Sequence, residues 1–379
     1  MEPVSGPGLW GRVVTATKVA VKKAVLTSPR SVRRLVSEDF YDDLQPEFLW
    51  IEVTGACGSR CAFCDIWKNK AVANPLTPSE IEAMLRDPLF ARLRVVIVSG
   101  GEPTVRKDLE DILLAIHRVR PTVFLVLSSS AMLPDRLLDV IESVLRRGMN
   151  LHVGVSLDGI GARHDQVRGI PGLFEKVDRT LRSLATLKEA HAGRLDVAVG
   201  FVVSDVTADQ LDAVRDYAQA LGVTFNPQWY NQGAYYGNED RDLLSDTVAL
   251  ERVTRNLRPT RLNELARGVL AGKPLDYRCT TLHNSCLLKS NGDMVPCFKH
   301  WNQKAGNIRQ ASPSEIWKSQ AARQTRQLVR DCRGCLNTCG VMWSQDANVM
   351  GRLGFRLRHP GLLLEKLGWP RGRAAERRA

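Results

Sequence analysis

The sequence predicts an α/β protein in which helices cover a parallel β-sheet, and three observations lead to that prediction. Short apolar runs alternate with amphipathic stretches of helical period from Leu49 onward. The runs are continuous or nearly continuous in apolar residues, which is typical of strands buried on both faces of a parallel sheet. Glycine or polar residues, rather than helix formers, follow all but the fifth of these runs.

The chain alternates strands and helices in a regular order. The expected strands span residues 49–53, 95–99, 123–127, 151–157, 197–203 and 223–228, and the expected helices span 77–86, 107–119, 134–147, 173–190 and 208–221. The first helix is well marked, because Thr77-Pro78-Ser79-Glu80 forms a capping box with proline in the first turn. Six such β/α units can form an open doubly wound sheet or part of a barrel. In both arrangements functional groups gather at the C-terminal ends of the strands.

The segments that follow the strands contain the residues that could bind a metal or a cofactor. In strand order, they contain Cys57, Cys61 and Cys64; Ser99-Gly100-Gly101-Glu102-Pro103; Ser128-Ser129-Ser130; Ser156-Leu157-Asp158-Gly159; and, after the sixth strand, the aromatic and amide-rich residues 229–237. Ordinary turns supply some glycine and serine. They do not supply three cysteines and a double glycine on the same rim.

The three cysteines have the spacing C-x3-C-x2-C. Three thiolates are one short of the set that normally holds a 4Fe-4S cube. A cube held by three leaves one iron with an open site, where a substrate or cofactor can bind. Half of a zinc site, completed elsewhere in the chain, is the alternative that the spacing alone leaves open.

Composition limits the class of protein. The 379 residues are 44% hydrophobic, which is enough for one large domain with a smaller one, or for two medium ones. No run of 18 apolar residues exists, so no transmembrane helix is expected. The N-terminus lacks the apolar core of a secretory signal, so we expect a cytoplasmic protein. Its nine cysteines then indicate metal or redox use rather than disulfides.

The net charge of +12 belongs to the two ends of the chain. Residues 3–37 carry seven Lys or Arg and no acid, and residues 350–379 carry a net charge of +6, so the remainder is close to neutral. Residues 8–37 have the pattern of a basic amphipathic helix, interrupted at Ser28-Pro29, that would suit a membrane surface or a partner. A solvated or frayed helix, and a disordered C-terminal tail, are the alternatives. No stacking motif supports nucleic-acid binding.

These motifs resemble a known family. Cys57-x3-Cys61-x-Phe63-Cys64, followed at the second strand end by Gly-Gly-Glu-Pro, closely resembles the radical S-adenosylmethionine (radical SAM) enzymes over residues 49–228. The resemblance implies a partial (β/α)6 TIM-like barrel. It also implies a 4Fe-4S cluster on the three thiolates, with S-adenosylmethionine chelated by its open iron. An electron from a flavodoxin or ferredoxin-type donor would cleave this cofactor to a 5′-deoxyadenosyl radical that abstracts a substrate hydrogen.

The resemblance also implies roles for individual residues. Phe63 would lie near the adenine, Gly100 and Gly101 would let the backbone approach the cofactor, and Glu102 would accept a hydrogen bond from its ammonium group. Arg168 would pair with its carboxylate, or would instead fix a loop through an ion pair. The other expected cofactor-binding residues are Pro103, Ser156 and Asp158, together with Ser129, which stands where the family often shows Thr-Asn-Gly. No general base or hydrogen donor can be named.

The second half resembles the SPASM or twitch extension of these enzymes, which holds auxiliary 4Fe-4S clusters. Cys279-x12-Gly292-x4-Cys297 fits its pattern, but the closing Cys332-x2-Cys335-x3-Cys339 lacks part of it. Six cysteines cannot hold two four-cysteine clusters. The sequence therefore predicts at least one auxiliary cluster, held by Cys279, Cys286, Cys297 and one of the last three; a second, incompletely ligated cluster and a zinc ribbon stay open.

The expected organisation has five parts. They are a basic amphipathic N-terminal segment (1–45), the radical SAM barrel (46–240), a helical connector (241–273), the SPASM/twitch-like domain (274–346) and a basic C-terminal tail (347–379). The expected function is that of a radical SAM oxidoreductase of dehydrogenase or epimerase type.

Two substrate hypotheses and one non-enzymatic alternative remain from the sequence. The first is a sugar, an aminocyclitol or a lipid-linked molecule, because Tyr230, Asn231 and Gln232 suit a hydroxyl-rich ligand and the tails suit a membrane-borne one. The second is a ribosomally made peptide, although the 48 residues before the first strand look too short and too helical for a peptide-recognition domain. The third is a non-catalytic iron–sulfur electron carrier, in which residues 100–103 would have no use.

Overall fold

The computed structural model describes residues 44–69, 72–257, 260–273, 275, 277–332 and 335–347. The two basic segments that were predicted at residues 8–37 and 350–379 lie outside these residues. No helix within the described ranges is both long and apolar enough to span a membrane.

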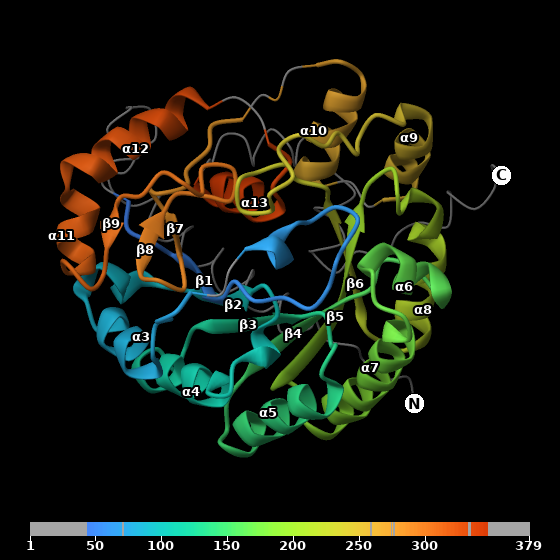
Figure 1. Cartoon of the computed structure of the whole chain (residues 1–379), viewed down its shortest axis with the longest axis horizontal. Coiled ribbons are helices and arrows are strands. Elements are labelled where there is room, and N and C mark those ends of the chain that lie inside the picture. Colours follow the sequence, from blue (N-terminus) through green and yellow to red (C-terminus); the bar gives the residue numbers. More distant parts are fainter. Residues whose placement is uncertain are drawn as a thin grey trace, which may run out of the picture.

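The described strands form one sheet of nine, in the order β6-β5-β4-β3-β2-β1-β7-β8-β9 (Figure 1). The first six pair in parallel. They are β1 (Phe48–Thr54), β2 (Val95–Gly100), β3 (Phe124–Ser129), β4 (Leu151–Ser156), β5 (Leu195–Val203) and β6 (Thr224–Trp229). The predicted parallel sheet is confirmed, and each strand lies within two residues of its expected bounds.

Helices surround the sheet on its outer side (Figure 1). They are α3 (Pro78–Leu85), α4 (Leu109–Val119), α5 (Pro134–Arg146), α6 (Ala162–Arg168), α7 (Leu173–Ala190) and α8 (Leu211–Ala220). All but α6 were predicted. The expected capping box is present, since the Thr77 side chain accepts from the backbone of Glu80 while the Glu80 side chain accepts from that of Thr77. The polar connector also forms helices, α9 (Thr247–Asn256) and α10 (Arg261–Leu270).

Alternate residues of β1, β2 and β3 serve two cores. In β1, Leu49, Ile51 and Val53 pack in the large aliphatic core shared with the surrounding helices. Phe48 and Trp50 point to the other face, into a separate cluster that is rich in aromatic residues. Successive side chains of a strand alternate between its faces, so Glu52 and the other inner residues line the concave side of the partial barrel.

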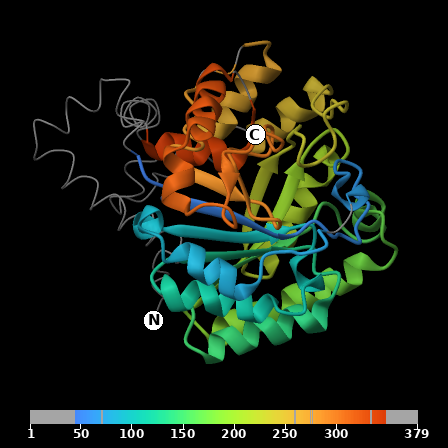
Figure 2. The same cartoon turned by 60° about the vertical axis from the view of Figure 1, so that its left-hand side comes forward.

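The cysteine-rich second half continues the same sheet. Strand β7 (Ser285–Leu288) pairs in parallel with β1, placing Phe48 opposite Ser285 and Ile51 opposite Leu288. Antiparallel β8 (Asp293–Val295) and β9 (Gly306–Asn307) follow it. The remaining helices, α11 (Pro313–Lys318), α12 (Gln320–Asp331) and α13 (Thr338–Ala347), lie beside these strands; in Figure 2 this orange and red part lies on one side of β1, opposite α3, α4 and α5.

Candidate iron–sulfur and cofactor sites

The three cysteines of the first motif lie on the loop that follows β1. Cys61 is buried, and Cys57 and Cys64 are half-buried. Burial raises the pKa of each thiol, for Cys64 to about 12, and the neighbouring cysteines raise it further at Cys57 and Cys64. The thiols are thus within electrostatic reach of one another. Without a bound cation they hold their protons, and metal ligation would remove them.

Helix α6, which the sequence analysis missed, holds this loop from one side. Its last turn accepts two backbone hydrogen bonds, from Arg60 N to Arg168 O at 2.9 Å and from Ala62 N to Val167 O at 2.9 Å. Gly169 then ends the helix in the left-handed region, at φ 67°. A Cβ at that position would lie 2.7 Å from the carbonyl oxygen of Arg60, so only glycine permits this approach.

The double glycine holds the loop from another side. Gly101 N donates to Thr54 O at 2.7 Å, and Glu102 N donates to Ala56 O at 2.8 Å. A Cβ on Gly100 would lie 2.3 Å from Thr54 O, and one on Gly101 would lie 2.2 Å from Ala56 O. The expected role of these glycines was close approach to a cofactor. In the structure their observed role is close approach of the β2 end to the start of the cysteine loop.

Glu102 is fully buried, and its carboxylate accepts five hydrogen bonds. The donors are Thr104 N and Oγ1, Ser129 Oγ, Ser130 N and Ser130 Oγ. A carboxylate offers about four lone-pair sites, so the predicted bond from the cofactor ammonium would have to displace one of these donors. Ser129 and Ser130 therefore hold the Glu102 carboxylate in place and link the ends of β2 and β3.

Arg168 forms the ion pair that was one of its two predicted roles. Its side chain is 10% exposed, and it pairs with Asp158, which is fully buried. Nη1 also lies 3.7 Å from Cys61 Sγ, and the guanidinium lies 5.5 Å from the centre of the Phe63 ring. The other Asp158 oxygen accepts from Val202 N at 2.7 Å, so contacts within the protein occupy this carboxylate, which was predicted to bind the cofactor.

The neighbours of this ion pair have simple roles. His164 Nδ1 accepts from Asp158 N at 3.1 Å. Burial, together with the charge of Arg168, lowers the pKa of His164 to about 3, so the ring stays neutral. Ser156 is half-buried at the end of β4, and Pro103 is buried in a 3₁₀ turn after β2.

Three buried donors near the thiols have no hydrogen-bond partner among the described residues. They are Ser59 Oγ, Arg168 Nε and the Tyr235 hydroxyl. An unpaired buried donor is costly, and donors gathered around thiols suit a group with acceptor atoms and negative charge. The residues present therefore fit a thiolate-bound iron–sulfur cluster with the carboxylate of a cofactor beside it.

A segment after β6, residues 230–241, covers the cysteine loop, and we call it the strap. Asn238 is fully buried and donates to Phe63 O at 2.9 Å and to Asn231 O at 3.1 Å. Another hydrogen bond joins the two segments, because Asp65 N of the loop donates to Tyr236 O of the strap at 2.7 Å. The loop is thus fixed on a third side.

The strap changes the interpretation of Tyr230 and Gln232. Both side chains donate to the carbonyl oxygen of Arg241, from Tyr230 at 3.0 Å, so they close the strap on itself. Of the three residues that suggested a hydroxyl-rich ligand, Asn231 lines a pocket. Because Tyr230 and Gln232 bond within the strap, the prediction of a sugar or aminocyclitol substrate is weakened.

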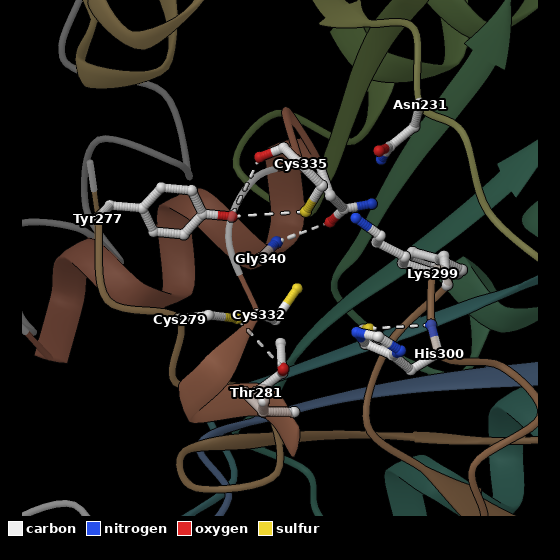
Figure 3. Close-up of a pocket in the computed structure, with 13 residues that line it drawn as sticks. Asn231, Tyr277, Cys279, Thr281, Lys299, His300, Cys332, Cys335 and Gly340 are labelled. Atoms are coloured by element: carbon white, nitrogen blue, oxygen red, sulfur yellow. Dashed lines mark hydrogen bonds between the residues drawn. The ribbon is translucent and has the colours of Figure 1, made fainter. Parts of the chain in front are cut away.

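Four cysteines of the second half line one pocket (Figure 3). They are Cys279, Cys297, Cys332 and Cys335; Asn231, Tyr277, Thr281, Lys299 and His300 also line it. Burial raises the pKa of Cys279 to about 11 and also that of Cys297, and Cys335 adds to both effects. Four thiols around one cavity fit the expected auxiliary cluster.

Cys286 is not part of this pocket, which corrects the predicted ligand set. It lies on β7, is fully buried in the aliphatic core, and the charge that acts on its thiol is that of Arg326. On β7, Cys286 pairs with Leu49 of β1, whose side chain lies in the same aliphatic core. The side chain of Cys339 lies outside the described ones.

Tyr277 secures the pocket at Cys335. Its hydroxyl donates to Cys335 O at 3.1 Å and lies 3.4 Å from Cys335 Sγ (Figure 3).

Within the described ranges, no three side chains of His, Cys, Asp or Glu form a group that could hold a single metal ion.

The ligand set predicts a difference between two cysteine variants. In anaerobically reconstituted protein, Cys335→Ala should lose about four iron atoms per chain. Cys286→Ala should keep the full iron content, because its thiol lies in the core. Iron analysis with protein quantitation measures both. Loss of iron in Cys286→Ala, with retention in Cys335→Ala, would contradict the assignment.

Two family models match the chain. Residues 51–217 match the radical SAM superfamily, and residues 279–336 match the SPASM iron–sulfur cluster-binding domain.

Individual relatives have different activities. Fe-coproporphyrin III synthase of Methanosarcina barkeri is 28% identical over 224 residues, covering 58% of this chain and 53% of that protein. Mycofactocin maturase MftC of Mycolicibacterium smegmatis is 29% identical over 330 residues, covering 82% and 80%. The crystal structure of Streptococcus suis SuiB bound to precursor peptide SuiA has a similar fold, with a TM-score of 0.59, 19% identity, and coverage of 80% and 72%.

Proposed function

We propose a function for this chain on the basis that it belongs to the radical SAM superfamily and carries a SPASM domain. The proposed function is modification of a ribosomally made peptide. The enzyme's cofactors are those of the superfamily, S-adenosylmethionine and a 4Fe-4S cluster, with auxiliary cluster binding in the SPASM domain. When bound, they supply one-electron chemistry that removes a hydrogen atom from the substrate. The electron would come from a flavodoxin or ferredoxin-type donor.

The extent of similarity to a peptide maturase carries this proposal. The alignment with MftC runs along 82% of this chain and 80% of that protein, so it extends well beyond the residues that either family model matches alone. SuiB, whose crystal structure has the precursor peptide SuiA bound, shares the fold over 80% of the chain. A small hydroxyl-rich substrate has lost its main support, because Tyr230 and Gln232 bond to the strap itself.

The residues that would hold the cofactors follow from the geometry. Cys57, Cys61 and Cys64 would hold the first cluster, with Arg168 keeping a positive charge at Cys61. Cys279, Cys297, Cys332 and Cys335 would hold the auxiliary cluster. The loop is fixed by α6, by the β2 end and by the strap, so the protein's part is to hold the first cluster rigidly at the end of the barrel.

The inner face of the sheet leaves room for a substrate near this cluster. Ser99, Ser128 and Ser156 are half-exposed on that face, toward the ends of three adjacent strands. Gly154 and Gly200 lie on the same face, and a Cβ on either would meet nothing closer than 3.8 Å. Small side chains and hydroxyls provide space and hydrogen bonds for an extended chain.

Filling this space should separate substrate modification from cofactor cleavage. We expect Gly200→Phe to lower peptide modification by about 100-fold, because a bulky ring displaces the substrate from reacting distance. Cleavage of S-adenosylmethionine without substrate should continue. Thr186→Phe, on the exposed outer face of α7, is the control and should leave both unchanged. Equal loss of both reactions in Gly200→Phe would contradict a substrate position at β5.

A tetrapyrrole substrate is the second candidate. The 28% identity with Fe-coproporphyrin III synthase favours it, although that alignment covers 53% of the relative.

The deciding experiment incubates reconstituted protein, dithionite and S-adenosylmethionine without oxygen, in parallel with peptides encoded by short reading frames beside its gene and with a panel of porphyrins. Mass spectrometry follows each substrate, and chromatography follows 5′-deoxyadenosine. A mass change in a peptide supports the first candidate, and consumption of a porphyrin alone supports the second. Iron binding without any 5′-deoxyadenosine would indicate an electron carrier and would exclude both.

A further inference from the structure

Tyr235 occupies the centre of the aromatic cluster beneath the strap. The residue is 3% exposed. Its ring centre lies 4.5 Å from that of Trp301, 5.1 Å from that of Phe298 and 5.2 Å from that of Trp50. These contacts satisfy the ring, and a phenylalanine would make them equally well.

The hydroxyl is the feature that packing does not explain. It is buried and has no hydrogen-bond partner in the part of the chain that the structure describes. A hydroxyl taken from water without a replacement partner destabilises the folded protein. A partner that is not part of the polypeptide would remove this cost.

The position of Tyr235 shows where that partner would be. Cys57 and Cys64 pack against the aromatic cluster that contains Tyr235, and Ile66, just beyond the cysteines, belongs to it. A cluster bound to Cys57 and Cys64 would therefore bring thiolate and sulfide acceptors to this side of the ring.

The backbone fixes the residue firmly. Tyr235 N donates to Phe298 O at 3.1 Å, and the next residue accepts from Asp65 N at 2.7 Å. Gly233 allows this close fit, because a Cβ there would lie 2.7 Å from Phe298 O. Little freedom remains for the ring to move its hydroxyl elsewhere.

We propose that the Tyr235 hydroxyl donates a hydrogen bond to the iron–sulfur cluster held by Cys57, Cys61 and Cys64, and thereby raises its reduction potential. Hydrogen bonds to the sulfurs are one of the means by which proteins set this potential. A donor stabilises the reduced cluster more than the oxidised one, since the reduced cluster carries one more negative charge. The proposal rests on cluster binding by the three cysteines and is independent of the substrate.

The test is Tyr235→Phe in anaerobically reconstituted full-length protein. A redox titration followed by EPR measures the cluster whose signal changes on addition of S-adenosylmethionine, which identifies the one with the open iron. At a fixed solution potential without the cofactor, we expect the ratio of reduced to oxidised cluster to fall roughly fivefold, as for loss of one hydrogen bond of ordinary net strength. Iron content should be unchanged.

A control and a second measurement separate this role from packing. Tyr217→Phe makes the same change on α8, where the hydroxyl donates to Asp178 at 2.6 Å, and should leave the ratio unchanged. In cluster-free protein, Tyr235→Phe should unfold at the same or higher urea concentration, because it removes an unpaired hydroxyl. Loss of stability there would assign the hydroxyl a partner within the protein and overturn the proposal.

Two further results would also overturn it. An unchanged potential in Tyr235→Phe would mean that the hydroxyl does not contact the cluster. A change that appears only after S-adenosylmethionine is added would place the hydrogen bond on that cofactor instead. Failure to find a modified peptide has no bearing on either result, because neither measurement uses a substrate.

Discussion

Replacing Cys61 by alanine is expected to abolish formation of 5′-deoxyadenosine. Cys61 is the most buried of the first three cysteines and the one that Arg168 contacts, at 3.7 Å from Nη1 to Sγ. Substitution of residues that merely support a metal ligand often costs 10- to 100-fold, so loss of a ligand itself should cost more than about 100-fold. Anaerobic incubation with dithionite and S-adenosylmethionine, followed by chromatography, measures the product.

Cys286→Ala is the matched control for this experiment. It makes the same chemical change at a cysteine that is fully buried on β7 and away from the pocket of the second half. It should retain cofactor cleavage, with a modest loss of stability from the small cavity. If Cys61→Ala still cleaved the cofactor at the normal rate, the assignment of the first cluster would be wrong.

Removing the charge of Asp158 should lower the free energy of unfolding more than removing the charge of an exposed carboxylate. Asp158→Asn leaves the Arg168 guanidinium buried beside Cys61 without its carboxylate partner, and breaking such a buried pair costs about 3–5 kcal/mol. Urea unfolding of the cluster-free protein measures this difference. Since α6 also carries the backbone carbonyls that hold the cysteine loop, iron loading should fall in the same variant.

An exposed pair provides the comparison. Asp178→Asn breaks a contact with Arg182, whose side chain is 62% exposed, and should shift the unfolding midpoint far less. The double variant Asp158→Leu, Arg168→Met should recover part of the lost stability, because neither charge then remains buried. A midpoint for Asp158→Asn close to that of Asp178→Asn would show that the buried pair contributes little.

The strands and outer helices could be predicted because their patterns are local. Apolar runs that are buried on both faces, and helices with one apolar side, leave a clear periodic signal. Helix α6 left none. It has seven residues between Gly161 and Gly169 and the polar sequence ARHDQVR, and it forms because its last turn bonds to the cysteine loop. Contacts far apart in sequence decide such an element.

The candidate sites were predictable in chemistry but not in detail. Spacing identified the cysteine motifs, yet it could not show that Cys286 lies on a strand that turns it into the core. Nor could it show that Ser129 and Ser130 donate hydrogen bonds to Glu102. The same is true of the ion pair between Arg168 and Asp158. Side-chain direction depends on tertiary pairing, and a linear motif contains no record of it.

The pairing of β1 with both β2 and β7 has a consequence for how this polypeptide can be divided. Cutting the chain before β7 would leave the backbone groups of a central strand without partners, and exposed edges of this kind attract other chains. A shortened version ending near residue 240 should therefore precipitate instead of working alone. Genetic dissection of the two halves will be informative only when both pieces are made together and allowed to reassociate.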